Sequence, residues 1–102
     1  MARIRFEWDE AKNLANQRKH GVSFEDAIEA FYDPLQVSVQ EGDYGGETRW
    51  QTFGLVKSVL LLMVVNTTWE EGDDETSVEA VRIISARPAT PKERRDYEIQ
   101  NR

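Results

Sequence analysis

The sequence predicts a single α+β domain in which helices pack on an antiparallel sheet of about four to five strands. The expected order of elements is β-α-α-β-β-β-β-α. Apolar segments with strand-like patterning follow one another from residue 35 to residue 86, a helical apolar face precedes them, and a helix-start signal follows them. A chain of 102 residues supports one modest core. We therefore assign residues 1–102 to one domain.

The first third of the chain predicts a strand and two helices. Apolar and charged residues alternate over residues 4–9, which indicates a half-buried strand. A helix is expected over residues 10–19, ending at Gly21, which can take the left-handed conformation. A second helix begins after Ser23 and stops at Asp33-Pro34. The expected apolar faces of the two helices are Ala11, Leu14 and Ala15, and Phe24, Ala27, Ile28 and Phe31.

The remainder predicts a meander of strands and a closing helix. The strands are expected at residues 35–39, 47–53, 59–65 and 80–86. The continuous apolar run at 59–65 indicates a central strand that is buried on both faces. Residues 70–79 are strongly acidic, which is typical of a solvated loop. Thr90, Pro91 and Glu93 then supply an N-cap, a first-turn proline and the acidic partner of a capping box.

Composition excludes several classes of site. The sequence has no cysteine and one histidine, so disulfides, thiolate zinc sites and a cysteine nucleophile are excluded, and a structural metal site is not expected. No signal-peptide pattern opens the chain, and the longest apolar run is too short to cross a bilayer. We therefore expect a cytoplasmic protein that needs no cofactor and has no membrane partner.

The charge of the chain is distributed unevenly. The net charge is −6, and residues 70–79 alone carry six acidic residues and no basic one. Residues 80–102 carry six basic residues and three acidic ones. The acidic balance weakens the case for non-specific binding of polyanions. However, the local field decides what binds at a cleft. The basic last quarter therefore suits a polyanionic substrate.

Short motifs follow one another along nearly the whole chain. They are Phe6-Glu7-Trp8-Asp9-Glu10-Ala11-Lys12, Asn16, Lys19-His20-Gly21-Val22-Ser23-Phe24, Phe31, Asp33-Pro34, Gly46-Glu47-Thr48-Arg49, Arg82-Ile83-Ile84-Ser85-Ala86-Arg87, Glu93-Arg94 and Tyr97-Glu98. In this order and spacing, the sequence resembles the BrnT family of bacterial type II toxins. The resemblance implies a RelE-like fold and a ribonuclease activity that inhibits translation. It also implies a BrnA-like antitoxin with a ribbon-helix-helix part, a toxin–antitoxin hetero-oligomer, and DNA contact only through that complex.

RNA cleavage without a metal needs a base for the 2′-hydroxyl, an acid for the leaving 5′-oxygen, and cations for the developing negative charge. His20 is the only histidine, beside Lys19, and its ordinary pKa suits acid–base chemistry. Its alternative role is to cap the end of the helix. Glu47 is a second candidate base, or a carboxylate that orients an arginine. Tyr97 is a candidate proton donor, or an anchor of the last helix.

Arginines are the candidate phosphate ligands. Arg87, just before Pro88, can hold a phosphate in two-point geometry or form an ion pair with a carboxylate such as Glu47. Arg82 lies five residues earlier, so strand alternation predicts that it points to the opposite face and that only one of the two faces the site. Arg49 is a further phosphate ligand or a member of a cross-strand salt bridge.

The other candidates bind substrate. Lys12 and Lys19 are two helical turns apart on one face, which suits either an RNA backbone or solvent. Trp69 lies beside the polar loop and is expected to stack on a base. Two other functions stay open, namely an antitoxin-binding module that has lost cleavage and, more weakly, a small metabolic enzyme. We expect the antitoxin to cover the basic cleft and an apolar sheet edge.

Overall fold

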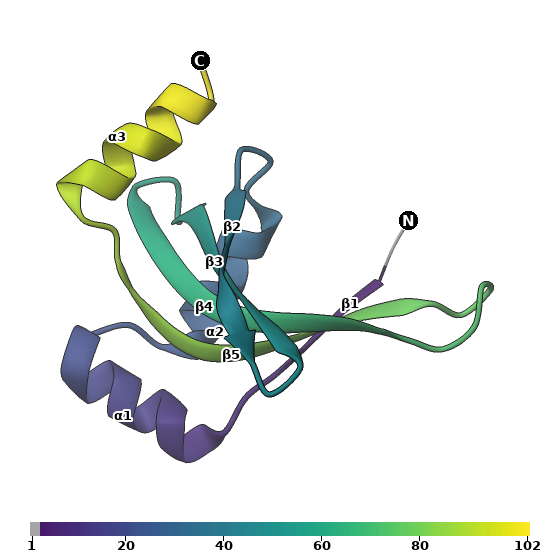
Figure 1. Ribbon diagram of the computed structural model, residues 1–102. Helices are drawn as coiled ribbons and strands as arrows, with labels where there is room; N and C mark the ends of the chain where they lie inside the picture. The colour runs from purple at the N-terminus through teal and green to yellow at the C-terminus, as the bar shows by residue number, and fades with distance from the viewer. Residues whose placement is uncertain (1–2) are drawn as a thin grey trace.

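The computed structural model describes residues 3–102 and has one five-stranded sheet at its centre (Figure 1). The strands are β1 (Arg3–Glu7), β2 (Val37–Tyr44), β3 (Glu47–Val56), β4 (Leu60–Glu71) and β5 (Val78–Pro88). The helices are α1 (Glu10–His20), α2 (Phe24–Ala27), the short 3₁₀ helix η1 (Ile28–Tyr32) and α3 (Pro91–Gln100). The predicted α+β class and the order β-α-α-β-β-β-β-α are confirmed.

The sheet is mixed, which differs from the expected antiparallel arrangement in one strand. Its order is β1-β5-β4-β3-β2, and β1 runs parallel to β5, whereas the other pairs are antiparallel. The helices between β1 and β2 carry the chain across the sheet, so the first strand lies beside the last one. β2 is consequently the edge strand at the other side.

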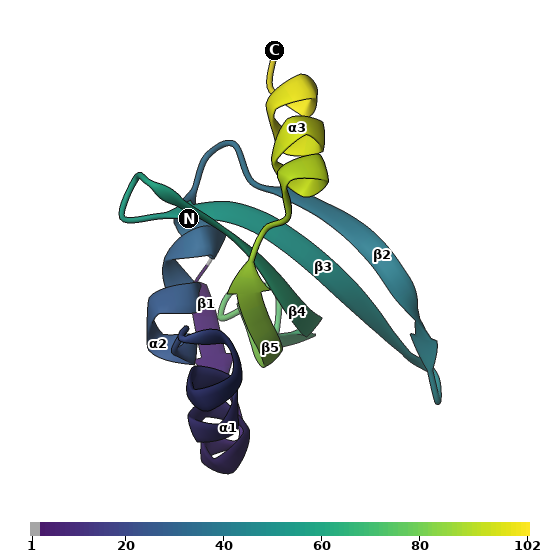
Figure 2. The same ribbon diagram turned by 90° about the vertical axis from the view of Figure 1, so that its left-hand side faces the viewer.

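Two apolar clusters cover the two faces of the sheet. On one face, α2 and η1 pack against apolar residues of β3, β4 and β5. Gly54 of β3 lies directly against η1, where a Cβ atom would overlap the Ala30 carbonyl oxygen. On the other face, Tyr97 of α3 packs against Phe53, Leu61, Met63 and Val65. Figure 2 shows α3 at one end of the molecule and α1 at the opposite end, so the second face is only partly covered.

Helix α1 is held by buried amides instead of the predicted apolar stripe. Asn16 donates to the carbonyl oxygens of Val22 and Ala86 and accepts from the Ala86 N–H, and it thereby satisfies the unpaired edge of β5. Asn13 accepts from the Phe24 N–H. Leu14 is 49% exposed. The expected helix end is confirmed, because Gly21 has φ +70° and donates to the Gln17 carbonyl.

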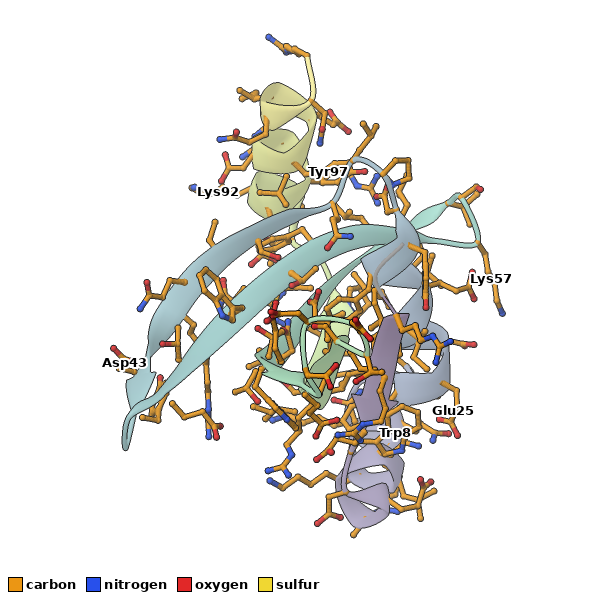
Figure 3. All side chains as sticks on the ribbon, turned by 90° about the vertical axis from the view of Figure 1, so that its right-hand side faces the viewer. Trp8, Glu25, Asp43, Lys57, Lys92 and Tyr97 are labelled. Atoms are coloured by element: carbon orange, nitrogen blue, oxygen red, sulfur yellow. The ribbon has the colours of Figure 1, made fainter. Side chains whose placement is uncertain are left out.

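Strand pairing extends beyond the predicted bounds. The acidic segment 70–79 is not one loop, because Glu70 and Glu71 end β4 opposite Glu79 and Val78 of β5. Only residues 72–77 form the turn, in which Asp73 accepts hydrogen bonds from Glu75 and Thr76. At the other end of β4, the turn from β3 is confined to Lys57 and its neighbours (Figure 3).

A bulge in β5 corrects the predicted orientation of Arg82. Ser85 pairs with Val65 and Ile83 pairs with Asn66, so Ile84 is an extra residue in β5. Because this residue resets the alternation of side chains, Arg82 opposite Thr67 and Arg87 opposite Met63 lie on the same face of the sheet. Thr67 and Met63 are four residues apart in a regular part of β4, so their side chains lie on one face. Their partners in β5, Arg82 and Arg87, must therefore lie on that face as well.

Candidate active site

Arg87 lies where β5 meets α3 and is bound to Glu93 instead of Glu47. Its two terminal nitrogens donate to the Glu93 carboxylate at 2.8 and 3.0 Å. Glu93 also accepts from the Thr90 N–H, completing the predicted capping box. The pKa of Glu93 is lowered, chiefly because Arg87 donates to the charged carboxylate. The Arg87 ion pair therefore joins the end of the sheet to the start of α3.

Tyr97 anchors α3 to the sheet through a buried carboxylate. Its hydroxyl donates to Asp33 at 2.6 Å, and Asp33 also accepts from the N–H groups of Leu35 and Leu55. Burial and the neighbouring Asp33 raise the pKa of Tyr97 to about 12. This geometry supports the anchoring role, because a phenol bound in this way is a poor source of protons at neutral pH.

Arg49 lies on the α3 side of the sheet, beyond the part that α3 covers. It is four residues before Phe53, so strand alternation places both on one face. Its guanidinium carbon is 4.4 Å from the centre of the Tyr44 ring. Within residues 3–102, no carboxylate lies within ion-pair distance of it, and its buried Nε has no hydrogen-bond partner. The predicted cross-strand salt bridge is therefore not formed, although Glu47 is two residues away.

Arg82 belongs to a network of charges on the same face. Its Nε and Nη2 both donate to Oε2 of Glu7 at 2.8 and 2.6 Å, and Arg5 bridges Glu7 and Glu71. The guanidinium carbon of Arg82 is 5.8 Å from the centre of the Trp69 ring. The half-buried Trp69 indole donates to Glu71 at 3.1 Å. The pKa of Glu7 is lowered because Arg82 and then Arg5 donate to it.

Helix α1 brings its cations to the edge of β5. A cavity of about 350 Å³ is lined by Lys12 together with Glu7 and Arg82. Asn16 is bound to Ala86, so α1 runs along β5 toward Pro88. Lys19 and the half-buried His20 therefore lie at the Pro88 end of the strand.

The predicted site residues thus form three separate groups. Arg49, Arg82 and Trp69 lie on the uncovered part of the sheet, with Lys12 beside Arg82 and Glu47 at the β2–β3 turn. Arg87 and Tyr97 lie at the base of α3, and Lys19 with His20 ends α1. The positions of Arg82 and Arg87 are separated by four residues of β4, which is about 13 Å of strand.

Three residues near the first group were not among the sequence candidates. They are Glu7, Tyr44 and Thr67. Thr67 is 1% exposed, and its hydroxyl has no partner within residues 3–102. Its signal was present in the sequence, because continuing the alternation of the central strand past Val65 places Thr67 on the face of Met63.

The described residues contain neither a metal-binding cluster nor a membrane-spanning helix. No three His, Asp or Glu side chains in residues 3–102 are grouped so as to hold a metal ion. Within the same residues, no helix has the length and apolar character needed to span a bilayer.

The fold is shared with a solved ribonuclease toxin. It matches the crystal structure of the Brucella abortus ribonuclease toxin BrnT at a TM-score of 0.55 and 24% sequence identity, over 88% of this chain and 99% of that one. Among curated proteins no sequence matches this chain. The two proteins therefore share a fold.

The family assignment follows from the sequence. Residues 8–93 match the family described as "Ribonuclease toxin, BrnT, of type II toxin-antitoxin system". The chain belongs to the BrnT family. A type II family implies an antitoxin as partner.

Proposed function

We propose that this chain is a metal-independent endoribonuclease that inhibits translation in the cytoplasm and is neutralised by a BrnA-like ribbon-helix-helix antitoxin. The observation that carries the proposal is Arg49, an arginine on the open face of a BrnT-family fold that forms no ion pair within residues 3–102. DNA would be contacted only by the antitoxin part of the complex. The alternative, a module that binds antitoxin without cleaving RNA, predicts no dependence of any activity on Arg49.

The proposed reaction is attack of the 2′-oxygen on the adjacent phosphorus, with departure of the 5′-oxygen. A base removes the 2′-proton, an acid protonates the leaving oxygen, and the products are a 2′,3′-cyclic phosphate and a 5′-hydroxyl. Arg49 and Arg82 would stabilise the charge that develops on the phosphorane oxygens, as fixed cations do without a metal. Glu47, two residues from Arg49, is the proposed base. His20 lies in a separate group at the end of α1, so its position does not support the role of acid at the same phosphate. Arg87 and Tyr97 would position α3.

Cleavage by the purified chain in the presence of EDTA tests this reaction. We expect single-stranded RNA to be cut equally with and without EDTA, because guanidinium groups supply the positive charge. The fragments should carry 5′-hydroxyl ends, which a polynucleotide kinase labels directly. Cleavage that EDTA abolishes and Mg²⁺ restores would contradict metal independence. Absence of cleavage by folded protein would favour the antitoxin-binding module.

The edge of the sheet at β2 is the proposed antitoxin surface. A groove of about 530 Å³ between α3 and the β2–β3 hairpin is lined by Val37, Val39, Phe53 and Ile99. Val39 is 45% exposed and Ile99 is 56% exposed. β2 also has an unpaired backbone edge, to which an added strand can bind. These features support coverage of the groove by the antitoxin.

Val39→Glu is expected to prevent neutralisation while leaving toxicity intact. A charge in the groove would have to be desolvated on binding, which costs affinity. Growth of cells that express both proteins measures the effect, and Leu14→Glu is the matched control, because Leu14 is an equally exposed apolar residue on α1. Full neutralisation of the Val39 variant would exclude this surface.

A further inference from the structure

The uncovered face contains a fork between two hairpins. Pairing of β3 with β4 ends at Trp50 and Asn66, beyond which the β2–β3 and β4–β5 hairpins diverge (Figure 1). Arg49 and Thr67 are the next residues on the two arms, and Arg82 lies opposite Thr67. Arg49 is four residues from Phe53 in β3, and Thr67 is four residues from Met63 in β4, so both lie on the face of that pair. Arg82 is opposite Thr67 and therefore lies on the same face.

Each arm of the fork carries an arginine against an aromatic ring. Arg49 lies over Tyr44 on one arm, and Arg82 lies near Trp69 on the other. Tyr44 is exposed and Trp69 is half-buried. Aromatic rings beside cationic groups are the usual platform for single-stranded nucleic acid, because the rings stack on bases while the cations hold the backbone.

Buried polar atoms at the base of the fork have no partner within residues 3–102. They are the hydroxyl of Thr67 and the Nε of Arg49. Buried polar groups in folded proteins are almost always hydrogen-bonded. A hydroxyl and an arginine N–H, on the two strands just beyond the last β3–β4 pair, are groups that can donate to the oxygens of a phosphate. Arg82 adds a nitrogen, Nη1, which Glu7 does not bind.

From these observations we infer that the fork binds single-stranded RNA, with one phosphate held by Thr67, Arg49 and Arg82 and the flanking bases stacked on Tyr44 and Trp69. The inference deepens the proposed function, on which it rests for the identity of the nucleic acid. Glu7 opposes the phosphate through its charge and holds Arg82 through its carboxylate. The site is distinct from the Arg87–Glu93 ion pair at the base of α3.

Binding of an uncleavable oligonucleotide tests the fork independently of catalysis. The probe is a short, fluorescein-labelled 2′-O-methyl RNA, which lacks the nucleophilic hydroxyl, and anisotropy gives its Kd. We expect Thr67→Val to weaken binding about tenfold, because one bond to a charged phosphate is lost. Tyr44→Ala should weaken it by a similar factor. Lys57→Gln, on the distant β3–β4 turn (Figure 3), removes one positive charge and should change Kd less than twofold.

Two further readouts separate binding from structure. Thr67→Val should unfold at the same temperature as the wild type or a higher one, because valine replaces an unpaired hydroxyl with a group of the same shape. Glu7→Gln should tighten binding by removing a negative charge. Wild-type affinity in both Thr67→Val and Tyr44→Ala would overturn the fork, even if RNA is cleaved. Loss of antitoxin binding instead of RNA binding in Thr67→Val would assign the fork to the antitoxin and also overturn it.

If the wild type binds the probe through the fork but cleaves no RNA, the proposed function fails and the fork stands. If the wild type cleaves RNA and neither Thr67→Val nor Tyr44→Ala weakens binding of the probe, the proposed function stands and the fork is not the RNA-binding site.

Discussion

Arg49→Gln is expected to reduce the rate of RNA cleavage roughly 100-fold or more, since removing one charged donor from a developing oxyanion has an effect of this size. Arg49 is the arginine of the open face that no carboxylate of residues 3–102 neutralises. Within these residues, no ion pair therefore neutralises its positive charge. Single-turnover cleavage by the purified protein measures the effect.

The fold should tolerate this change. Arg49 makes no ion pair among residues 3–102 and lies over the Tyr44 ring, so we expect the unfolding temperature to stay within a few degrees of the wild type. Lys57→Gln provides the comparison, because it removes the same charge at the opposite end of the sheet. Equal loss of activity in both variants would show that net charge, and not the site, governs cleavage.

Asp33→Asn is expected to lower the free energy of unfolding by about 3 kcal/mol. The buried carboxylate accepts three hydrogen bonds, from the Tyr97 hydroxyl and two backbone N–H groups. An amide of the same shape cannot accept all of them, so a buried donor is left without a partner. Chemical denaturation at neutral pH measures the loss. A change within experimental error would contradict the anchoring role that we assign to Tyr97.

The same pair predicts how stability depends on pH. Burial alone would raise the pKa of Asp33, but the hydrogen bonds from Tyr97, Leu55 and Leu35 outweigh it and lower the pKa below the ordinary value of 3.8. The Asp33 contribution is therefore present above about pH 4 and is lost as the pH falls through the lowered pKa. The Tyr97 contribution is present below pH 10 and is lost as the pH rises toward its pKa of about 12.

Two variants separate the acid and the alkaline parts of the pH dependence of stability. Asp33→Asn should lack the part of the acid dependence that belongs to Asp33, and Tyr97→Phe should lack the corresponding alkaline part. Denaturation curves of the three proteins across the pH range make the comparison. Identical acid limbs in the wild type and Asp33→Asn would show that Asp33 titrates alike in the folded and unfolded protein.

Local patterns were sufficient to predict the fold class and most elements. The capping residues Ser23 and Thr90 and the terminal Gly21 act within one helical turn, so their effects could be read from neighbouring residues. Helix α1 shows where this approach fails. Its buried positions are Asn13 and Asn16, because the unpaired edge of β5 needs hydrogen-bond partners more than apolar contacts. That need depends on the pairing of strands distant in the sequence.

The arrangement of the site was predicted less well than its residue types. Arginines were correctly expected around the sheet, but alternation alone put Arg82 and Arg87 on opposite faces. The bulge at Ile84, which a sequence pattern does not mark, brings them to one face. The partner of Arg87 likewise depends on the angle at which α3 leaves the sheet. Thr67 was missed, although the alternation of the central strand places it on the face of Met63, and in the structure its buried hydroxyl has no partner within residues 3–102.

Primer extension on cellular messenger RNA, shortly after induced expression, tests most directly whether this chain cleaves RNA through its open face. The wild type, Arg49→Gln and Lys57→Gln are compared at equal levels of soluble protein. We predict new 5′ ends at the same positions with the wild type and Lys57→Gln, and none above background with Arg49→Gln. New ends of equal intensity in all three would contradict the assigned site. No new ends with the soluble wild type would contradict ribonuclease activity itself.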